Sequence, residues 1–157
     1  MNSKQLAIKA SEHIFAKKGY DVSILDLSRL TSFADYFVIC SADSDTQVKA
    51  ISDEVERKLR EGGIHSWHRE GYDSLNWVLL DYVDVVVHIF KKDSRQFYNL
   101  EKLWGDAPVI EVTDPSIEME KKSSSGGAKK ISKSSSRKTV IKKSGTGTKR
   151  SSKTSGK

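Results

Sequence analysis

The chain has 157 residues, and its charge is divided unevenly along its length. Residues 1–120 hold 14 Lys and Arg and all 21 Asp and Glu, whereas residues 121–157 hold 13 Lys and Arg and no acid, so the net charge of +6 comes from the C-terminal stretch. A single cysteine, Cys40, excludes an internal disulfide, no apolar run approaches the ~20 residues of a membrane span, and the start lacks a secretory apolar segment, so we expect a cytoplasmic protein with no membrane partner.

Composition predicts one folded domain, residues 1–112, followed by a disordered basic tail, residues 113–157. Residues 121–157 contain no Trp, Phe, Tyr or Leu and consist mostly of Ser, Lys, Gly and Thr. Such a stretch cannot bury enough apolar area to offset the entropy of ordering the chain. The part before it has the usual length of a domain with one core.

Helical periodicity predicts three helices in the domain. Apolar residues recur at spacings of three and four over about residues 3–18, with Ser3 as the N-cap, and over about residues 44–61. A third helix is expected from Lys91 until Gly105 closes it. The residues expected to point inward from it are Phe97, Leu100 and Leu103.

Apolar and β-branched runs predict five strands, at residues 22–27, 36–40, 64–69, 77–80 and 85–87, with residues 109–112 as a further short extended segment. The stretch from Trp77 to Phe90 is the expected centre of the sheet. Its two apolar runs are separated by the turn sequence Asp-Tyr-Val-Asp and are apolar at consecutive positions, which is typical of strands covered on both faces. The order of elements predicts an α/β domain with a mixed five-stranded sheet flanked by helices.

The cysteine and the histidines do not have the pattern of a reactive site. Cys40 ends an apolar strand, where a free thiol usually behaves as a small hydrophobe. His65 and His68 have no companion Cys or acidic cluster at metal-ligand spacing. We therefore expect neither a metal nor a cofactor.

The acidic residues leave one enzymatic alternative open. Asp81, Asp84 and Asp93 bracket strand ends, where aspartate is a common turn former, and we interpret them as such. Asp43 and Asp45 lie in a polar loop between a strand and a helix, which resembles weakly the loop of nucleotidyltransferases. A nucleotide-transferring enzyme that requires Mg²⁺ is therefore the alternative function.

Five aromatic residues surround the predicted hairpin and last helix: Trp77, Tyr82, Phe97, Tyr98 and Trp104. Core packing is the default explanation for each of them. Trp and Tyr are also enriched in interface hot spots, and five such rings in a short stretch exceed what a core of this size needs. The pattern predicts a protein-binding face built from the hairpin and the last helix.

Several long motifs occur in a fixed order. They are DLS at residues 26–28, TSFADYFVIC at 31–40, Glu70-Gly71, WVLLDYVDVVVHIF at 77–90, and Arg95 followed by FYNLEKLW at 97–104. Together they closely resemble the Iojap family, the ribosomal silencing factors, over nearly all of residues 3–107. The chain departs from the family pattern after Cys40, where Ala42 and Thr46-Gln47 stand in place of a glycine and an Arg-Gln pair.

The resemblance implies a factor without enzymatic activity that binds the large ribosomal subunit through ribosomal protein fourteen. It would block joining of the small subunit and lower translation when nutrients are short. The resemblance also implies a nucleotidyltransferase-like core without catalytic residues and a dimer in the free state. The family's ribosome-facing positions map onto Trp77, Leu80, Asp81 and Tyr82, and less directly onto Tyr98 and Trp104.

Two alternatives remain open within this assignment. Leu80 and Trp104 are apolar enough to be core residues instead of contact residues. The basic tail either contacts ribosomal RNA through phosphates or serves only as a solubilising extension. A ribosomal partner favours the contact with RNA.

Overall fold

The computed structural model describes residues 1–117 and 119, so most of the predicted basic tail lies outside the described residues. The helices are α1 (Ser3–Ala16), α2 (Asp45–Glu61), α3 (Lys92–Tyr98) and α4 (Leu100–Leu103). The strands are β1 (Tyr20–Asp26), β2 (Tyr36–Ala42), β3 (His68–Glu70), β4 (Trp77–Asp81), β5 (Val85–Lys91) and β6 (Val109–Glu111). None of the helices described is long and apolar enough to cross a membrane.

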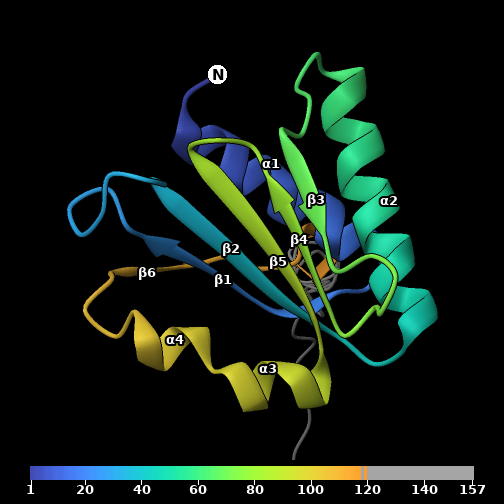
Figure 1. The fold of residues 1–157 in the computed structure, drawn as a ribbon. Coiled ribbons are helices and arrows are strands. Elements are labelled where there is room, and N and C mark those ends of the chain that lie inside the picture. Colours follow the sequence, from blue (N-terminus) through green and yellow to red (C-terminus); the bar gives the residue numbers. More distant parts are fainter. Residues whose placement is uncertain (118, 120–157) are drawn as a thin grey trace, which may run out of the picture. The chain divides into compact units, whose positions relative to one another are not determined.

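The strands form one mixed sheet in the order β3-β4-β5-β2-β1-β6 (Figure 1). Strands β2 and β5 pair in parallel at its centre, and the remaining pairs are antiparallel. The predicted α/β class is confirmed, but the predicted number of five strands is wrong, because β6 adds a sixth at the edge beside β1. The backbone N–H of Asp26 donates to the Pro108 carbonyl and starts this short pairing.

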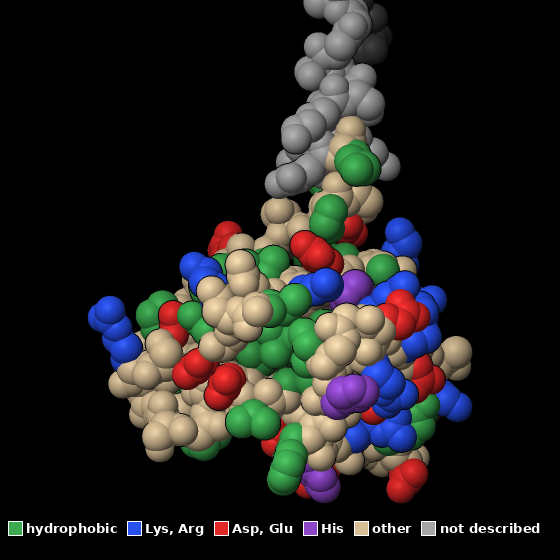
Figure 2. Space-filling view, turned by 90° about the horizontal axis from the view of Figure 1, so that it is seen from above, with side chains coloured by type: hydrophobic (Ala, Val, Ile, Leu, Met, Phe, Trp, Pro, Cys, Tyr) green, Lys and Arg blue, Asp and Glu red, His purple; other side chains and the backbone are tan. Residues whose placement is uncertain are grey.

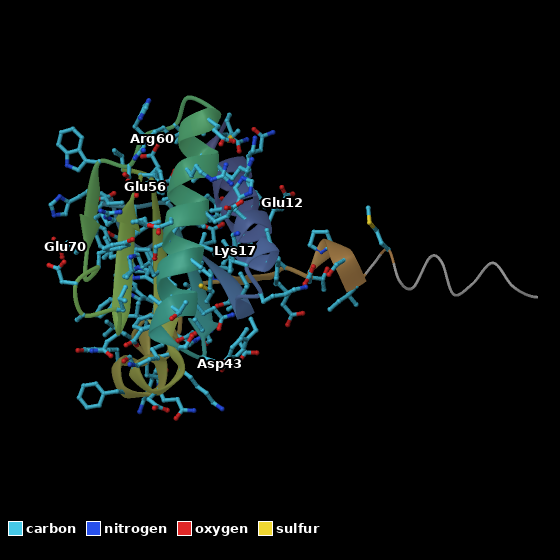
Figure 3. The ribbon with its side chains drawn as sticks, turned by 90° about the vertical axis from the view of Figure 1, so that its right-hand side faces the viewer. Glu12, Lys17, Asp43, Glu56, Arg60 and Glu70 are labelled. Carbon is cyan, nitrogen blue, oxygen red and sulfur yellow. The ribbon has the colours of Figure 1, made fainter. Side chains whose placement is uncertain are left out.

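Helices α1 and α2 pack against one face of the sheet, which we call the back face, and the opposite face is the front face (Figures 1 and 3). The back face is covered by a core that includes Ile14 of α1 and Ile51, Val55 and Leu59 of α2. A smaller cluster on the front face joins Phe37, Val86 and Phe90 to Leu100 of α4. The two faces of the sheet therefore have different covers.

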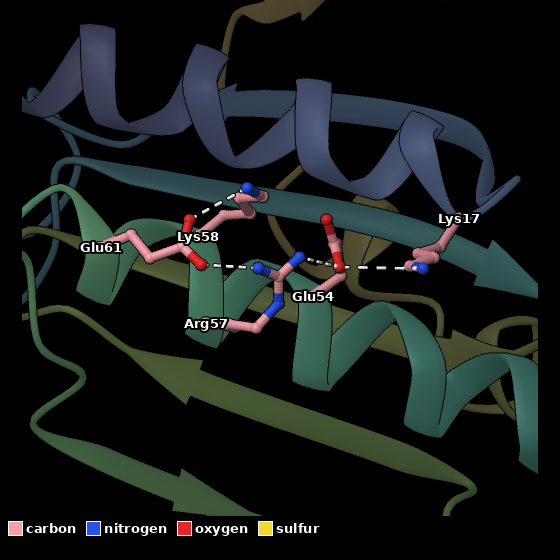
Figure 4. Close-up of polar contacts among 5 residues, drawn as sticks. All are labelled: Lys17, Glu54, Arg57, Lys58 and Glu61. Atoms are coloured by element: carbon pink, nitrogen blue, oxygen red, sulfur yellow. Dashed lines mark hydrogen bonds and ion pairs between the residues drawn. The ribbon is translucent and has the colours of Figure 1, made fainter.

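The solvent side of α2 carries a chain of ion pairs (Figure 4). Arg57 lies between Glu54 and Glu61, and Lys58 also pairs with Glu61. Lys17, just after α1, reaches Glu54 at 3.7 Å and joins the two helices. The hydrogen bond from Arg57 lowers the pKa of Glu54. Exposed pairs of this kind contribute little stability, so the apolar core holds α1 and α2 on the sheet.

Several predicted boundaries are wrong by a few residues. Helix α1 is capped by Asn2 rather than Ser3, because the Asn2 side chain and Gln5 form a reciprocal capping box. The predicted strand at 64–69 is reduced to β3, which begins at His68. Periodicity does not show this shortening, because alternating residues before a strand resemble the strand itself.

The third predicted helix is broken into α3 and α4. Asn99 takes a left-handed conformation with φ of 45°, which ends α3, and its side chain accepts a hydrogen bond from the Lys102 backbone N–H. Of the predicted inward residues, only Leu100 is buried, while Phe97 is 82% and Leu103 is 73% exposed. The break turns these two side chains into solvent, which a continuous helix pattern does not predict.

Candidate protein-binding face

The two strands of the hairpin differ in burial. Strand β5 is buried from Val85 to Phe90, as predicted for a strand covered on both faces. In β4 the residues alternate: Val78 and Leu80 are fully buried on the back face, whereas Trp77, Leu79 and Asp81 on the front face remain partly exposed. The prediction of two covered faces is therefore wrong for β4. It fails because α1 and α2 cover only the back face of β4.

Leu80 and Tyr82 lie in the core rather than on the surface. Leu80 is 0% and Tyr82 is 6% exposed, and both belong to the cluster packed against α1 and α2. The Tyr82 hydroxyl finds no hydrogen-bond partner among the described residues, and burial raises the pKa of this group. The burial of both side chains favours the core alternative for Leu80 and extends it to Tyr82.

Trp77 is held in a cluster of rings on the front face. Its ring lies 4.9 Å from Phe90 and 4.8 Å from Tyr98, measured between centroids. The indole Nε1–H donates to Nδ1 of His88 at 3.1 Å. Tyr98, which is 50% exposed, extends the cluster to the surface. Trp77 and Tyr98 are therefore brought together, as the predicted face requires.

His88 is a site residue that sequence reasoning missed. Its side chain is buried, and burial lowers its pKa to about 3, so the imidazole is neutral and Nδ1 is free to accept from Trp77. The proton therefore sits on Nε2, which is buried without a partner among the described residues. A polar residue in the middle of an apolar strand was the available signal.

Trp104 and Arg95 fix the end of the face formed by α3 and α4. Trp104 is partly buried, and its ring meets Phe33 and Phe37 edge to face, each at 5.9 Å between centroids. Arg95 donates to the Glu101 carboxylate, to the Asp21 carbonyl at 2.6 Å, and to the Ser41 hydroxyl at 2.8 Å. Arg95 therefore ties the broken helix to β1 and β2.

Asp81 shapes the turn between β4 and β5. Its Oδ1 accepts from the backbone N–H of Val83 at 2.8 Å, which confirms the interpretation of Asp81 as a turn former. Val83 has a φ of 70°, and Asp84 N–H donates to the Tyr82 carbonyl across it. Asp81 makes no ion pair with any residue that the structure describes. Asp81 remains partly exposed.

The residues of the enzymatic alternative are engaged elsewhere. Asp43 accepts a hydrogen bond from the Tyr20 hydroxyl at 2.6 Å, and Asp45 pairs with Lys91 at 2.8 Å. Among the described residues no group of three or more His, Cys, Asp and Glu could hold a metal ion. Cys40 is buried, and burial raises the pKa of its thiol to about 12, which suits a core residue and not a nucleophile. No observation favours the alternative.

The comparisons of this chain with known proteins agree on one family. The chain matches the family model "Ribosomal silencing factor during starvation" over residues 1–140. It is 46% identical over 112 residues to the Ribosomal silencing factor RsfS of Bacillus subtilis, which covers 71% of this chain and 95% of that protein. It is 38% identical over 98 residues to the chloroplastic protein Iojap of Zea mays, covering 60% of this chain and 41% of that protein.

Solved structures agree with the family model. A crystal structure of a protein from Chromobacterium violaceum has a TM-score of 0.65 and 39% identity, with coverage of 67% of this chain and 88% of that chain. A crystal structure from Bacillus halodurans has a TM-score of 0.62 and 40% identity, with coverage of 69% and 99%. The long motifs, the fold and the family model lead to one conclusion: the chain belongs to the family of ribosomal silencing factors.

Proposed function

We propose that this protein silences translation by binding the large ribosomal subunit through ribosomal protein fourteen and blocking its association with the small subunit, above all when nutrients are limiting. The observation that carries the proposal is the family match, together with the partly exposed Trp77, Asp81 and Tyr98 on the front face. Binding and exclusion need no chemistry. The protein acts as a steric factor and not as an enzyme.

The front face has the properties of a protein-binding surface. Trp77 supplies a large apolar contact whose orientation is already fixed by His88 and Phe90, so little side-chain entropy is lost when a partner binds. Asp81 supplies a carboxylate for a basic group on the ribosomal protein. Leu80 and Tyr82 support this face from the core behind it.

The test is co-sedimentation of the full-length protein with isolated large subunits, with subunit joining scored in the same tubes. We expect wild type to bind and to block joining, and Trp77→Ala to weaken both by about tenfold or more, since hot-spot aromatics commonly contribute ~2 kcal/mol. Phe15→Ala removes a half-buried ring from α1 on the back face and serves as the matched control. Failure of wild type to bind, or joining that proceeds normally, contradicts the proposal.

Three further points belong to the same proposal. The basic residues of 121–157 contact ribosomal RNA, so a chain that ends at residue 120 should lose affinity, more at low salt than at high salt. Equal binding by the two chains at every salt concentration removes the tail from the mechanism.

The free protein forms a homodimer, which light scattering tests directly. The core is nucleotidyltransferase-like and is used for binding alone.

A further inference from the structure

Three large apolar side chains are exposed around the β4–β5 turn. Trp67 is 79%, Phe33 is 59% and Val83 is 58% exposed. With Asp81 they line a depression of about 370 Å³. They come from three segments: the loop between β1 and β2, the segment before β3, and the turn itself. Figure 2 looks from above onto the end of the molecule at which the β4–β5 turn lies, and it shows hydrophobic side chains exposed at the surface there.

The backbone around Asp81 holds this depression in shape. The N–H of Trp67 donates to the Asp81 carbonyl at 2.7 Å, and the N–H of Val83 donates to the Asp81 carboxylate at 2.8 Å. Phe33 is fixed from behind by ring contacts with Phe37 and Trp104. One residue thus positions two walls of the depression and places its own charge between them.

Val83 is held at an energetic cost. Its φ of 70° is in the left-handed region, where a β-branched residue is a true outlier. Such strain is energetically unfavourable and concentrates at functional sites. A glycine at this position would avoid the cost but would leave the depression without one wall. The strained position therefore presents an apolar side chain at the tip of the turn.

The depression carries an acidic group, the carboxylate of Asp81. Asp81 and the neighbouring Asp84 make no ion pair within the described part of the chain. His68, which lies opposite Asp81 across the β3–β4 pairing, is hydrogen-bonded to Glu70 instead. An acidic group beside apolar and aromatic side chains complements a cation on a long apolar stem.

We infer that Phe33, Trp67, Asp81 and Val83 form a slot for an arginine side chain of the protein partner. A guanidinium group is flat, so it can stack on the indole of Trp67 while its N–H groups pair with the Asp81 carboxylate. The inference rests on the proposed function and adds a second contact point to it. The slot and Trp77 lie at opposite ends of β4, about 13 Å apart at the usual rise of a strand.

The experiment is a double-mutant cycle on affinity for isolated large subunits, using full-length protein. Trp67→Ala and Asp81→Asn should each weaken binding about tenfold, and Asn keeps the oxygen that accepts from Val83. The double variant should lose much less than a hundredfold, because both substitutions remove contacts to one guanidinium group. Asp73→Asn and Val109→Ala are matched controls, since both side chains are exposed outside the slot and outside the predicted binding face.

A second variant separates binding from folding. Val83→Gly removes a wall of the slot and also relieves the left-handed strain, so affinity should fall several-fold while the thermal midpoint does not fall. The slot is contradicted if Trp67→Ala binds as tightly as wild type. It is also contradicted if the affinity loss of the double variant equals the product of the two single losses. If Trp77→Ala still loses binding in that case, the proposed function stands without the slot. If wild type itself does not bind, both fall.

Discussion

The two faces of the sheet are formed by the same strands but are covered differently. The back face is covered by α1 and α2 and contains fully buried aliphatic residues such as Val78 and Leu80. The front face of β4 carries Trp77, Leu79 and Asp81, none of them fully buried. Adjacent residues of one strand therefore lie in turn in the core and on the partly open front face.

The contrast teaches how a small domain keeps an apolar surface in a defined shape. On the back face the order comes from packing between helices and sheet. On the front face it comes from specific contacts, namely the Trp77–His88 hydrogen bond, the Arg95 ties and the Asp81 turn. Substitutions on the back should therefore act on stability, and those on the front on binding.

The largest effect is expected from Leu80→Ala compared with Leu79→Ala. Leu80 is fully buried, so its truncation should lower the free energy of unfolding by about 3 kcal/mol. Leu79 is partly exposed on the front face, and its truncation should cost about 1 kcal/mol or less. Urea unfolding followed by circular dichroism measures both. Equal losses would show that the front face is packed as tightly as the back.

The second effect concerns pH and His88. Because burial lowers the folded-state pKa of His88 to about 3, the unfolded chain takes up a proton first as pH falls below 6.5. Stability should therefore decrease below pH 6.5, by at most about 1.4 kcal/mol per pH unit for this group. Unfolding between pH 7 and pH 4.5 measures the slope.

His88→Asn provides the comparison for that slope. Asparagine places an acceptor near the position of Nδ1 and cannot titrate, so the variant should lose the part of the slope due to His88 and keep Trp77 in place. The pKa of His13 is also lowered by burial, so a smaller slope should remain. An unchanged slope in His88→Asn would mean that His88 takes up its proton in the folded state.

A smaller effect is expected from Arg95→Lys. Lysine keeps the charge but lacks the planar group that reaches Glu101, the Asp21 carbonyl and Ser41 together. Stability should fall by about 1.5 kcal/mol, and hydrogen exchange should quicken in α3 and α4. Lys92→Ala, an exposed residue in the same helix, is the control. Unchanged exchange in Arg95→Lys would show that packing alone holds the broken helix.

Sequence patterns predicted most of the elements because periodicity reports burial. They failed where backbone geometry and the arrangement of the elements, and not hydrophobicity, determine which side chains are buried. The run from Trp77 to Leu80 is apolar at every position, so the sequence does not tell which side of β4 is left uncovered. The break at Asn99 interrupts an unbroken helix pattern, and the tolerance of Asn for left-handed φ was the only signal.

The same geometry decides where the residues of the candidate site lie. Trp77 and Tyr98 are brought together as expected, whereas Leu80 and Tyr82 prove to be core residues. Strand alternation places Leu80 behind the sheet once Trp77 is in front. Trp67 could not be found in this way, because it alternates with its neighbours like a strand residue although it lies before β3 and is exposed.

The smallest effect is expected from Tyr82→Phe, and it tests the contrast at its most ambiguous residue. The Tyr82 hydroxyl is buried without a partner in the described chain, so its removal should leave stability unchanged or raise it by up to about 1 kcal/mol at pH 7. Burial raises the folded-state pKa, so wild type should lose stability above pH 10 as the unfolded chain ionises, and the variant should lose less. The hydrogen bond to Asp43 raises the pKa of Tyr20 to about 12, so Tyr20 causes part of the loss of stability at high pH in both proteins. Unfolding at pH 7 and pH 10.5 tests stability, and large-subunit affinity tests recognition: weaker binding with unchanged stability would place Tyr82 in the interface and not in the core.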